Sequence, residues 1–198
     1  MEDNVREKIR DAVLTEEEKE ILREEKIDLY DYQQDVMNCS SDRIAFVGGR
    51  QVGKTKLAIE WAKENNADIV APNHRMVEEI KSKCSGGVKV FSEKSNLRKV
   101  FRAGNNIVFD EAATMDLSIK NVIDKHYGKI LMVGSDVHLD YNNFIEFCKN
   151  KDTKVFTADM YDCPQIDGQY IDQFMEKVGT ASVCQEVEGK FVVDAKEL

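Results

Sequence analysis

The chain has 198 residues, which is enough for one domain with a full hydrophobic core. Its composition, 42% hydrophobic and 33% charged, is that of a soluble globular protein, and no apolar run is long enough to span a bilayer. A net charge of −9 argues against indiscriminate binding to nucleic acid.

Cysteine usage and the first residues bear on the cellular compartment. Five scattered cysteines without a CxxC pair indicate reduced thiols in a cytosol rather than a disulfide framework or a zinc site. The acidic residues 1–5 lack the apolar core of a secretory signal. We therefore expect a cytoplasmic protein that makes no contact with a membrane.

The first third of the chain predicts surface helices and then a core strand. Residues 5–26 indicate two charged helices, the second opened by Thr15 with Glu18 at the spacing of a capping box. Residues 29–37 predict a short helix, and 44–47 predict a buried strand. We place a domain boundary between the acidic N-terminal segment, 1–27, and a domain over 28–198.

The segment after that strand has the pattern GxxxxGK[ST], with a predicted helix over 57–62 behind it. Strand, glycine-rich loop and helix in this order are typical of a phosphate-binding loop. Its backbone N–H groups and the helix N-terminus attract phosphate, Lys54 reaches the β/γ-phosphates, and the Thr55 hydroxyl binds Mg²⁺. The alternative is a chance match in a strand-to-helix turn. The predicted loop residues are Gly48, Gly49, Arg50, Gln51, Val52, Gly53, Lys54 and Thr55.

Strands and helices alternate along the rest of the chain. Predicted strands cover 68–72, 88–91, 106–109, 129–134, 154–157 and 191–193, and predicted helices cover 74–82, 116–126, 141–149 and 167–178. Residues 95–102 fit either a helix or a hairpin. This alternation predicts an α/β fold with a doubly wound, mainly parallel sheet, whose ligands lie at the carboxyl ends of the strands.

Two adjacent carboxylates, Asp110 and Glu111, follow the apolar strand that starts near Asn106. In a protein with a phosphate loop this is the Walker B arrangement, in which Asp110 binds Mg²⁺ together with Thr55. Glu111 then orients and polarises the attacking water. The second acid favours hydrolysis over mere binding, so the sequence predicts a Mg²⁺-dependent ATPase of the RecA-like (ASCE) P-loop class.

Two further patterns leave alternatives open. Residues 75–102 hold eight basic and three acidic side chains, so this segment is either a DNA-facing patch or a solvated face. The candidate DNA contacts are Lys94, Arg98, Lys99 and Arg102. Alternate potential ligands at Asp136, His138 and Asp140 suggest a metal site or, alternatively, a polar loop after a strand.

Four features together resemble the ATPase domain of the large terminase subunit, the DNA-packaging motor of tailed viruses, over residues 28–194. The pair Tyr32-Gln33 precedes the phosphate loop, and the loop contains Arg50-Gln51. The acidic motif reads Phe-Asp-Glu-Ala-Ala over 109–113, and the chain closes with Cys-Pro-Gln-Ile at 163–166 and Gln-Glu-Val-Glu-Gly-Lys-Phe-Val at 185–192.

The resemblance implies further roles. Gln33 corresponds to an adenine-reading glutamine, Arg50 to an arginine acting on the γ-phosphate within the subunit, and Ser135 to a coupling motif, from which Asp136 departs. Implied partners are double-stranded DNA, a homo-oligomeric ring with an arginine finger from a neighbour, a portal and a small terminase subunit. The resemblance does not include the family's nuclease domain, so we expect either an isolated ATPase domain or a nuclease on a separate polypeptide, and we assign no nuclease activity. For a virus, the location is the host cytoplasm.

Two alternatives remain at this stage. One is a one-lobed helicase-like ATPase, although a complete helicase needs a second lobe. The other is a nucleotide-binding assembly module with negligible hydrolysis, against which Glu111 argues.

Overall fold

Apolar runs at six places in the chain form the strands of one parallel sheet. The computed structural model describes residues 29–84, 87–95, 105–115, 123–135, 143–177 and 187–188. The fold belongs to the unit Asp31–Leu198, and of the unit Met1–Tyr30 only the last two residues are described. The predicted boundary near residue 28 and the helices over 5–26 therefore stay predictions.

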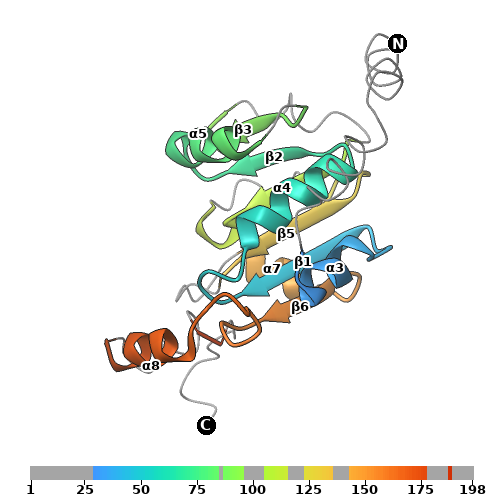
Figure 1. Ribbon diagram of the computed structural model, residues 1–198. Coiled ribbons are helices and arrows are strands. Elements are labelled where there is room, and N and C mark those ends of the chain that lie inside the picture. Colours follow the sequence, from blue (N-terminus) through green and yellow to red (C-terminus); the bar gives the residue numbers. More distant parts are fainter. Residues whose placement is uncertain are drawn as a thin grey trace, which may run out of the picture. The chain divides into compact units, whose positions relative to one another are not determined.

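The sheet has the strand order β3-β2-β4-β5-β1-β6, and every pair is parallel (Figure 1). The chain leaves β1 in one direction across the sheet and later returns to add β6 on the other side of β1, so the carboxyl end of β1 is a topological switch point. The strands are β1 (Arg43–Gly48), β2 (Asp68–Ala71), β3 (Val90–Ser92), β4 (Ile107–Asp110), β5 (Ile130–Gly134) and β6 (Lys154–Ala158).

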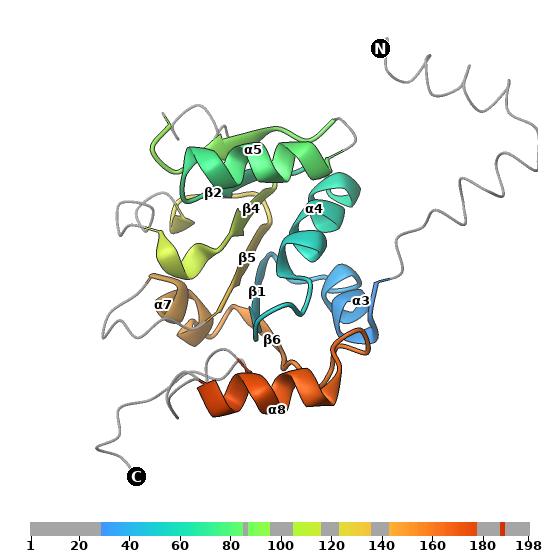
Figure 2. The same ribbon diagram turned by 60° about the vertical axis from the view of Figure 1, so that its left-hand side comes forward.

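Helices cover both faces of the sheet (Figure 2). Alternate residues of β1 enter two cores: Phe46 packs with Leu57 and Trp61 of α4, whereas Val47 packs in the cluster of Phe144 from α7. The helices are α3 (Asp31–Met37), α4 (Lys54–Glu64), α5 (His74–Lys83), the 3-10 helix η2 (Ala112–Thr114), α7 (Asn143–Lys149) and α8 (Gly168–Lys177). The predicted doubly wound α/β fold is confirmed.

Most predicted elements lie where the sequence places them, with bounds shifted by one to three residues. Of the predicted helix over 116–126, the structure describes only 123–126: Ile123 is helical, and Asp124 and Lys125 form a turn before β5, so the helix ends three residues earlier than predicted. The proposed strand over 191–193 and most of 95–102 lie outside the described residues. None of the helices in the described ranges is long and apolar enough to cross a membrane.

Candidate nucleotide-binding site

The loop over residues 48–53 joins the buried end of β1 to the start of α4. Gln51 and Gly53 have left-handed backbones, with φ of 62° and 76°. A Cβ on Gly48 would lie 2.6 Å from Cγ2 of Val52, so only glycine fits there. The Gly49 N–H donates to the Ala158 carbonyl at 3.0 Å, which ties the loop to the end of β6. The sequence pattern thus corresponds to a tightly curved, anchored loop.

Helix α4 begins at a glycine cap. Gly53 occupies the cap position and makes no side-chain cap hydrogen bond, and the first-turn N–H groups carry the positive end of the helix dipole. Lys54 is buried, with its Nζ 3.2 Å from the Gly48 carbonyl oxygen and 2.7 Å from that of Gly49. The ammonium group therefore lies within the curve of the loop, where an anion would meet both charges.

The Thr55 hydroxyl donates to Oδ2 of Asp110 at 3.0 Å, which joins the start of α4 to the end of β4. Asp110 is fully buried, and its other oxygen, Oδ1, has no hydrogen-bond partner within the described part of the chain. Burial, aided by the neighbouring Glu111 charge, raises the pKa of Asp110 to about 6, against the opposing effects of the Thr55 hydrogen bond and Lys54. A hydroxyl beside a carboxylate with an unpaired oxygen is a donor set that suits Mg²⁺.

Glu111 directly follows β4 and has a left-handed backbone, with φ of 53°. A non-glycine residue in this region is strained and is held by its surroundings. Thr114 supplies the restraint, because its N–H and its hydroxyl both donate to the Glu111 carbonyl, at 3.0 and 2.9 Å. The side chain of Glu111 is half-buried and begins one residue from the candidate metal ligand Asp110.

Helix α3 lies against the phosphate loop. Gln33 is fully buried, and its Nε2 donates to the carbonyls of Val52 and Gly53, at 3.3 and 3.1 Å. The Tyr32 hydroxyl donates to the same Val52 carbonyl at 3.0 Å. The role of Gln33 in reading adenine stays a prediction. The sequence predicted no role for Tyr32, and its position next to Gln33 was the only feature that could have indicated one.

Helix α8 contacts the loop from the other end of the chain, which the sequence did not predict. The Arg50 guanidinium carbon lies 5.7 Å from the centroid of the Phe174 ring, a cation–π geometry. Gln51 donates from Nε2 to the Tyr170 hydroxyl at 3.2 Å, and Cys163 Sγ lies 3.9 Å from the Gln51 carbonyl. The two aromatic residues of α8, Tyr170 and Phe174, are four residues apart and stack on each other. Their spacing is visible in the sequence, but it does not indicate that they contact the loop.

The other predicted site residues are placed as follows. Ser135 directly follows β5, the strand between β4 and β1, and is half-buried. Lys94 is exposed in the turn after β3, the edge strand, at the end of the sheet farthest from β6. The other three candidate DNA contacts, and the possible metal ligands over 136–140, lie outside the described residues; elsewhere in the described ranges no group of three His, Cys, Asp or Glu could hold a metal ion.

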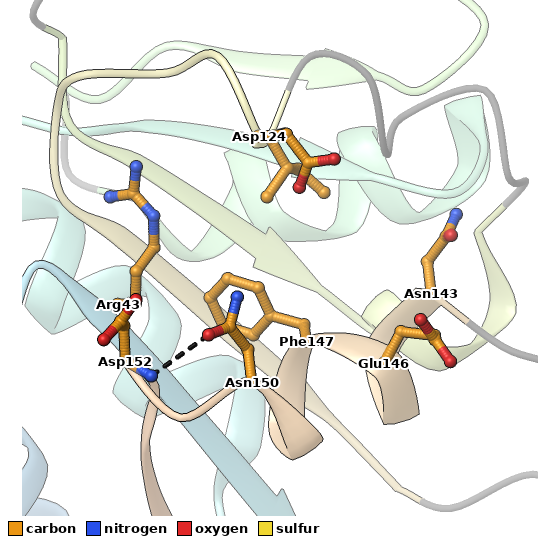
Figure 3. Close-up of a pocket in the computed structure, with 8 residues that line it drawn as sticks. Arg43, Asp124, Asn143, Glu146, Phe147, Asn150 and Asp152 are labelled. Atoms are coloured by element: carbon orange, nitrogen blue, oxygen red, sulfur yellow. Dashed lines mark hydrogen bonds between the residues drawn. The ribbon is translucent and has the colours of Figure 1, made fainter.

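A cavity of about 370 Å³ lies beside the start of β1 and helix α7 (Figure 3). Arg43, at the start of β1, lines it together with Glu146 and Phe147 from α7. The Asp152 N–H donates to Oδ1 of Asn150 at its rim, at 3.0 Å. None of the predicted site residues that the structure describes lines this cavity. It is therefore separate from the candidate nucleotide-binding site.

Comparisons with known proteins bear on the fold. No family model and no curated protein matches the chain. Among solved structures, it is similar to the large terminase ATPase domain of Thermus phage P74-26, at 15% identity and a TM-score of 0.63, over 83% of this chain and 94% of that one. It is also similar to the large terminase of a thermophilic bacteriophage, at 13% identity and a TM-score of 0.63, over 84% of this chain and 54% of that one.

The latter terminase has also been solved with ADP and with ATP-γ-S, and those structures match with TM-scores of 0.58 and 0.57 at 13% identity. In both, the similarity extends over more than four-fifths of this chain and about half of the other. At these identities the likeness establishes the fold. This chain has the fold of the ATPase domain of large terminase subunits, a P-loop NTPase fold.

Proposed function

We propose that this protein is a Mg²⁺-dependent ATPase of the terminase motor type. The observation that carries the proposal is the pair Thr55–Asp110, a hydroxyl and a carboxylate oxygen 3.0 Å apart beside the loop over 48–53, in which the other, buried carboxylate oxygen has no hydrogen-bond partner among the described residues. This donor set fits a divalent cation of the Mg²⁺ type. The fold match to terminase ATPase domains, including structures with ADP and ATP-γ-S, supports the choice of nucleotide.

Thr55 and Asp110 are the residues that would hold the metal. When bound, Mg²⁺ would neutralise charge on the β- and γ-phosphate oxygens. Asp110 must be ionised to bind it, so its raised pKa makes metal binding dependent on pH in the range near 6. The N–H groups of residues 50–55, which lead into the start of α4, would bind the phosphate chain.

The remaining roles concern the hydrolysis step. Glu111 would accept a hydrogen bond from the attacking water and direct its oxygen at the γ-phosphorus. Lys54, now on the loop carbonyls, would turn its ammonium to the β/γ-phosphates, and Arg50 would add charge at the γ-phosphate. A neighbouring subunit would supply a further arginine, a group whose removal costs about 10³–10⁵ in rate in related reactions.

The work done with this energy would be translocation of double-stranded DNA into a viral capsid. Ser135 directly follows β5, which lies between β4, the strand that ends in the acids, and β1, the strand before the phosphate loop. In the coupling role, Ser135 would transmit the structural change that follows loss of the γ-phosphate. Lys94, Arg98, Lys99 and Arg102 would contact DNA. The active form would be a homo-oligomeric ring in the host cytoplasm, working with a portal and a small terminase subunit.

The residues leave two other functions to be tested. A one-lobed helicase-like ATPase would hydrolyse ATP on single-stranded DNA in preference to duplex. An assembly module would bind ATP without turnover. Steady-state phosphate release, measured at increasing protein concentration with no DNA, with single-stranded DNA and with duplex DNA, separates the three. The motor requires a rate per subunit that rises with concentration and with duplex DNA.

A further inference from the structure

Helix α3 holds the phosphate loop by three hydrogen bonds to two adjacent carbonyls. The Val52 carbonyl accepts from the Tyr32 hydroxyl at 3.0 Å and from Gln33 Nε2 at 3.3 Å, and the Gly53 carbonyl accepts from the same Nε2 at 3.1 Å. The amide NH₂ has two hydrogens and faces two acceptors, which fixes its orientation. Gln33 is fully buried, and Tyr32 stacks on Phe46 of β1 with ring centroids 6.0 Å apart.

These contacts decide where the loop N–H groups point. In a trans peptide the C=O and the following N–H point in opposite directions. A Val52 carbonyl held toward α3 therefore turns the Gly53 N–H away from α3, to the side where an anion would lie. The Gly53 carbonyl also accepts from Leu57 N–H, the first hydrogen bond of α4, so Gln33 joins a loop peptide to the rigid start of the helix.

Gly53 and Gln33 are fitted to each other. A Cβ on Gly53 would lie 2.6 Å from Gln33 Nε2, and φ at Gly53 is +76°. The left-handed turn at Gly53 brings its carbonyl within reach of the buried amide, and the space a side chain would take is filled by that amide. The conformation of the loop thus depends on a residue that lies 20 positions earlier in the chain.

We propose that Tyr32 and Gln33 are positioning residues, which aim the phosphate loop at the triphosphate, and that Gln33 contributes to nucleotide affinity through the phosphates and not through the base. This inference rests on the proposed function, since it names what prepares that same site. It differs from the adenine-reading role, in which the amide faces the base, because here the amide is buried and donates to the loop.

A ligand without a base separates the two roles. We would measure affinities of the full chain for ATP, GTP and inorganic tripolyphosphate, with Mg²⁺, by calorimetry. The variants are Gln33→Met, which keeps the shape and removes the donors, and Tyr32→Phe, which keeps the stacked ring and removes the hydroxyl. We expect Gln33→Met to weaken ATP and tripolyphosphate by the same factor, about tenfold or more, and Tyr32→Phe by a smaller factor. The ratio of ATP to GTP affinity should not change.

Two variants control for stability and for position. Val36→Ala removes core volume from the same helix and keeps the three hydrogen bonds to the loop carbonyls, so it should lower Tm without weakening tripolyphosphate binding. Gln34→Met makes the same chemical change at an exposed neighbour and should have no effect on either. A loss of tripolyphosphate affinity in Val36→Ala equal to that in Gln33→Met would overturn the inference, since general destabilisation would then explain it.

The outcomes also distinguish this inference from the proposed function. If Gln33→Met left tripolyphosphate binding intact but weakened ATP and abolished selectivity over GTP, Gln33 would be a base reader and the inference would fail alone. The same holds if neither ligand were affected. If the unaltered protein bound neither ATP nor tripolyphosphate while Tm showed it to be folded, the proposed function would fail, and the inference with it.

Discussion

The guanidinium of Arg50 in the phosphate loop lies over the ring of Phe174 in α8, 5.7 Å from its centroid. The loop that is expected to bind ATP is therefore joined to a helix more than a hundred residues later, and Gln51 repeats the connection through Tyr170. Arg50 is proposed to act on the γ-phosphate, and to reach it the guanidinium must leave the Phe174 ring. The contact with α8 therefore competes with the contact to the phosphate.

Phe174→Leu tests this competition. Leucine keeps the apolar bulk and removes the ring face, a contact worth about 0.5–1 kcal/mol at a partly exposed site. We expect ATP to bind about two- to fivefold more tightly and ADP to bind as before, because only ATP has the γ-phosphate. Affinities from titration calorimetry give the comparison. An equal change for ADP would show that α8 acts on the loop as a whole rather than on Arg50.

The burial of Asp110 predicts how stability varies with pH. Its pKa is raised from 3.8 to about 6 in the folded protein, so between these values the folded state keeps a proton that the unfolded chain has released. Stability from this group is therefore full at low pH and is lost as pH rises through about 6, by roughly 3 kcal/mol in total.

Asp110→Asn removes this loss. Without Mg²⁺, the difference between the Tm of the variant and that of the unaltered protein should rise in the variant's favour from pH 4 to 6. From pH 6 to 8 this difference should stay constant. Added Mg²⁺ and ATP should raise the Tm of the unaltered protein and have little effect on the variant. A difference in Tm that does not vary with pH would mean that Asp110 does not titrate in this range.

Lys54→Ala should abolish binding of ATP and leave the fold intact. Lys54 is buried, but its Nζ contacts the loop carbonyls of Gly48 and Gly49, so its loss removes a charge near the expected phosphates rather than part of the hydrophobic core. Calorimetry measures the binding, and circular dichroism checks the fold. Unchanged kcat and KM in this variant would remove the phosphate-loop interpretation. The matched control is Lys56→Ala, which removes a lysine from the same helix but outside the motif.

The basic segment is expected to contact DNA. Reversing Lys94, Arg98, Lys99 and Arg102 to glutamate should weaken duplex binding and flatten its dependence on salt, because each lost phosphate contact removes about 0.9 from the log–log slope. Basal ATP hydrolysis should change little, since these residues lie outside the nucleotide motifs. An unchanged affinity and salt slope in the folded variant would place the DNA contacts elsewhere.

The parts of the structure that could be predicted from the sequence are those set by local pattern. The apolar runs predicted the strands. Because the carboxyl ends of parallel strands lie at the same edge of a sheet, the sequence also predicted that Thr55 and Asp110 meet there. The end of the helix predicted over 116–126 lies three residues too late, because the chain turns at Asp124 and Lys125; helix ends are the least predictable part of a local pattern.

The contacts that the sequence could not give are those between distant segments. Nothing near Tyr170 or Phe174 states that their partners are Gln51 and Arg50, because this pairing depends on how the chain packs beyond β6. The buried position of Gln33 has the same origin. A glutamine on a short helix is expected to be exposed, but here the carbonyls of Val52 and Gly53 accept hydrogen bonds from its amide NH₂ in the interior.

The most direct test of the central claim is the rate of phosphate release from ATP by Glu111→Gln, compared with the unaltered protein in the presence of Mg²⁺ and duplex DNA. The amide keeps the shape of the side chain but cannot act as a base for water. We expect hydrolysis to slow by about 10²–10⁴, with Mg²⁺·ATP affinity retained and activity of the unaltered protein abolished by EDTA. Equal rates for the two proteins, or no Mg²⁺-dependent turnover by the unaltered protein in any oligomeric state, would contradict the account.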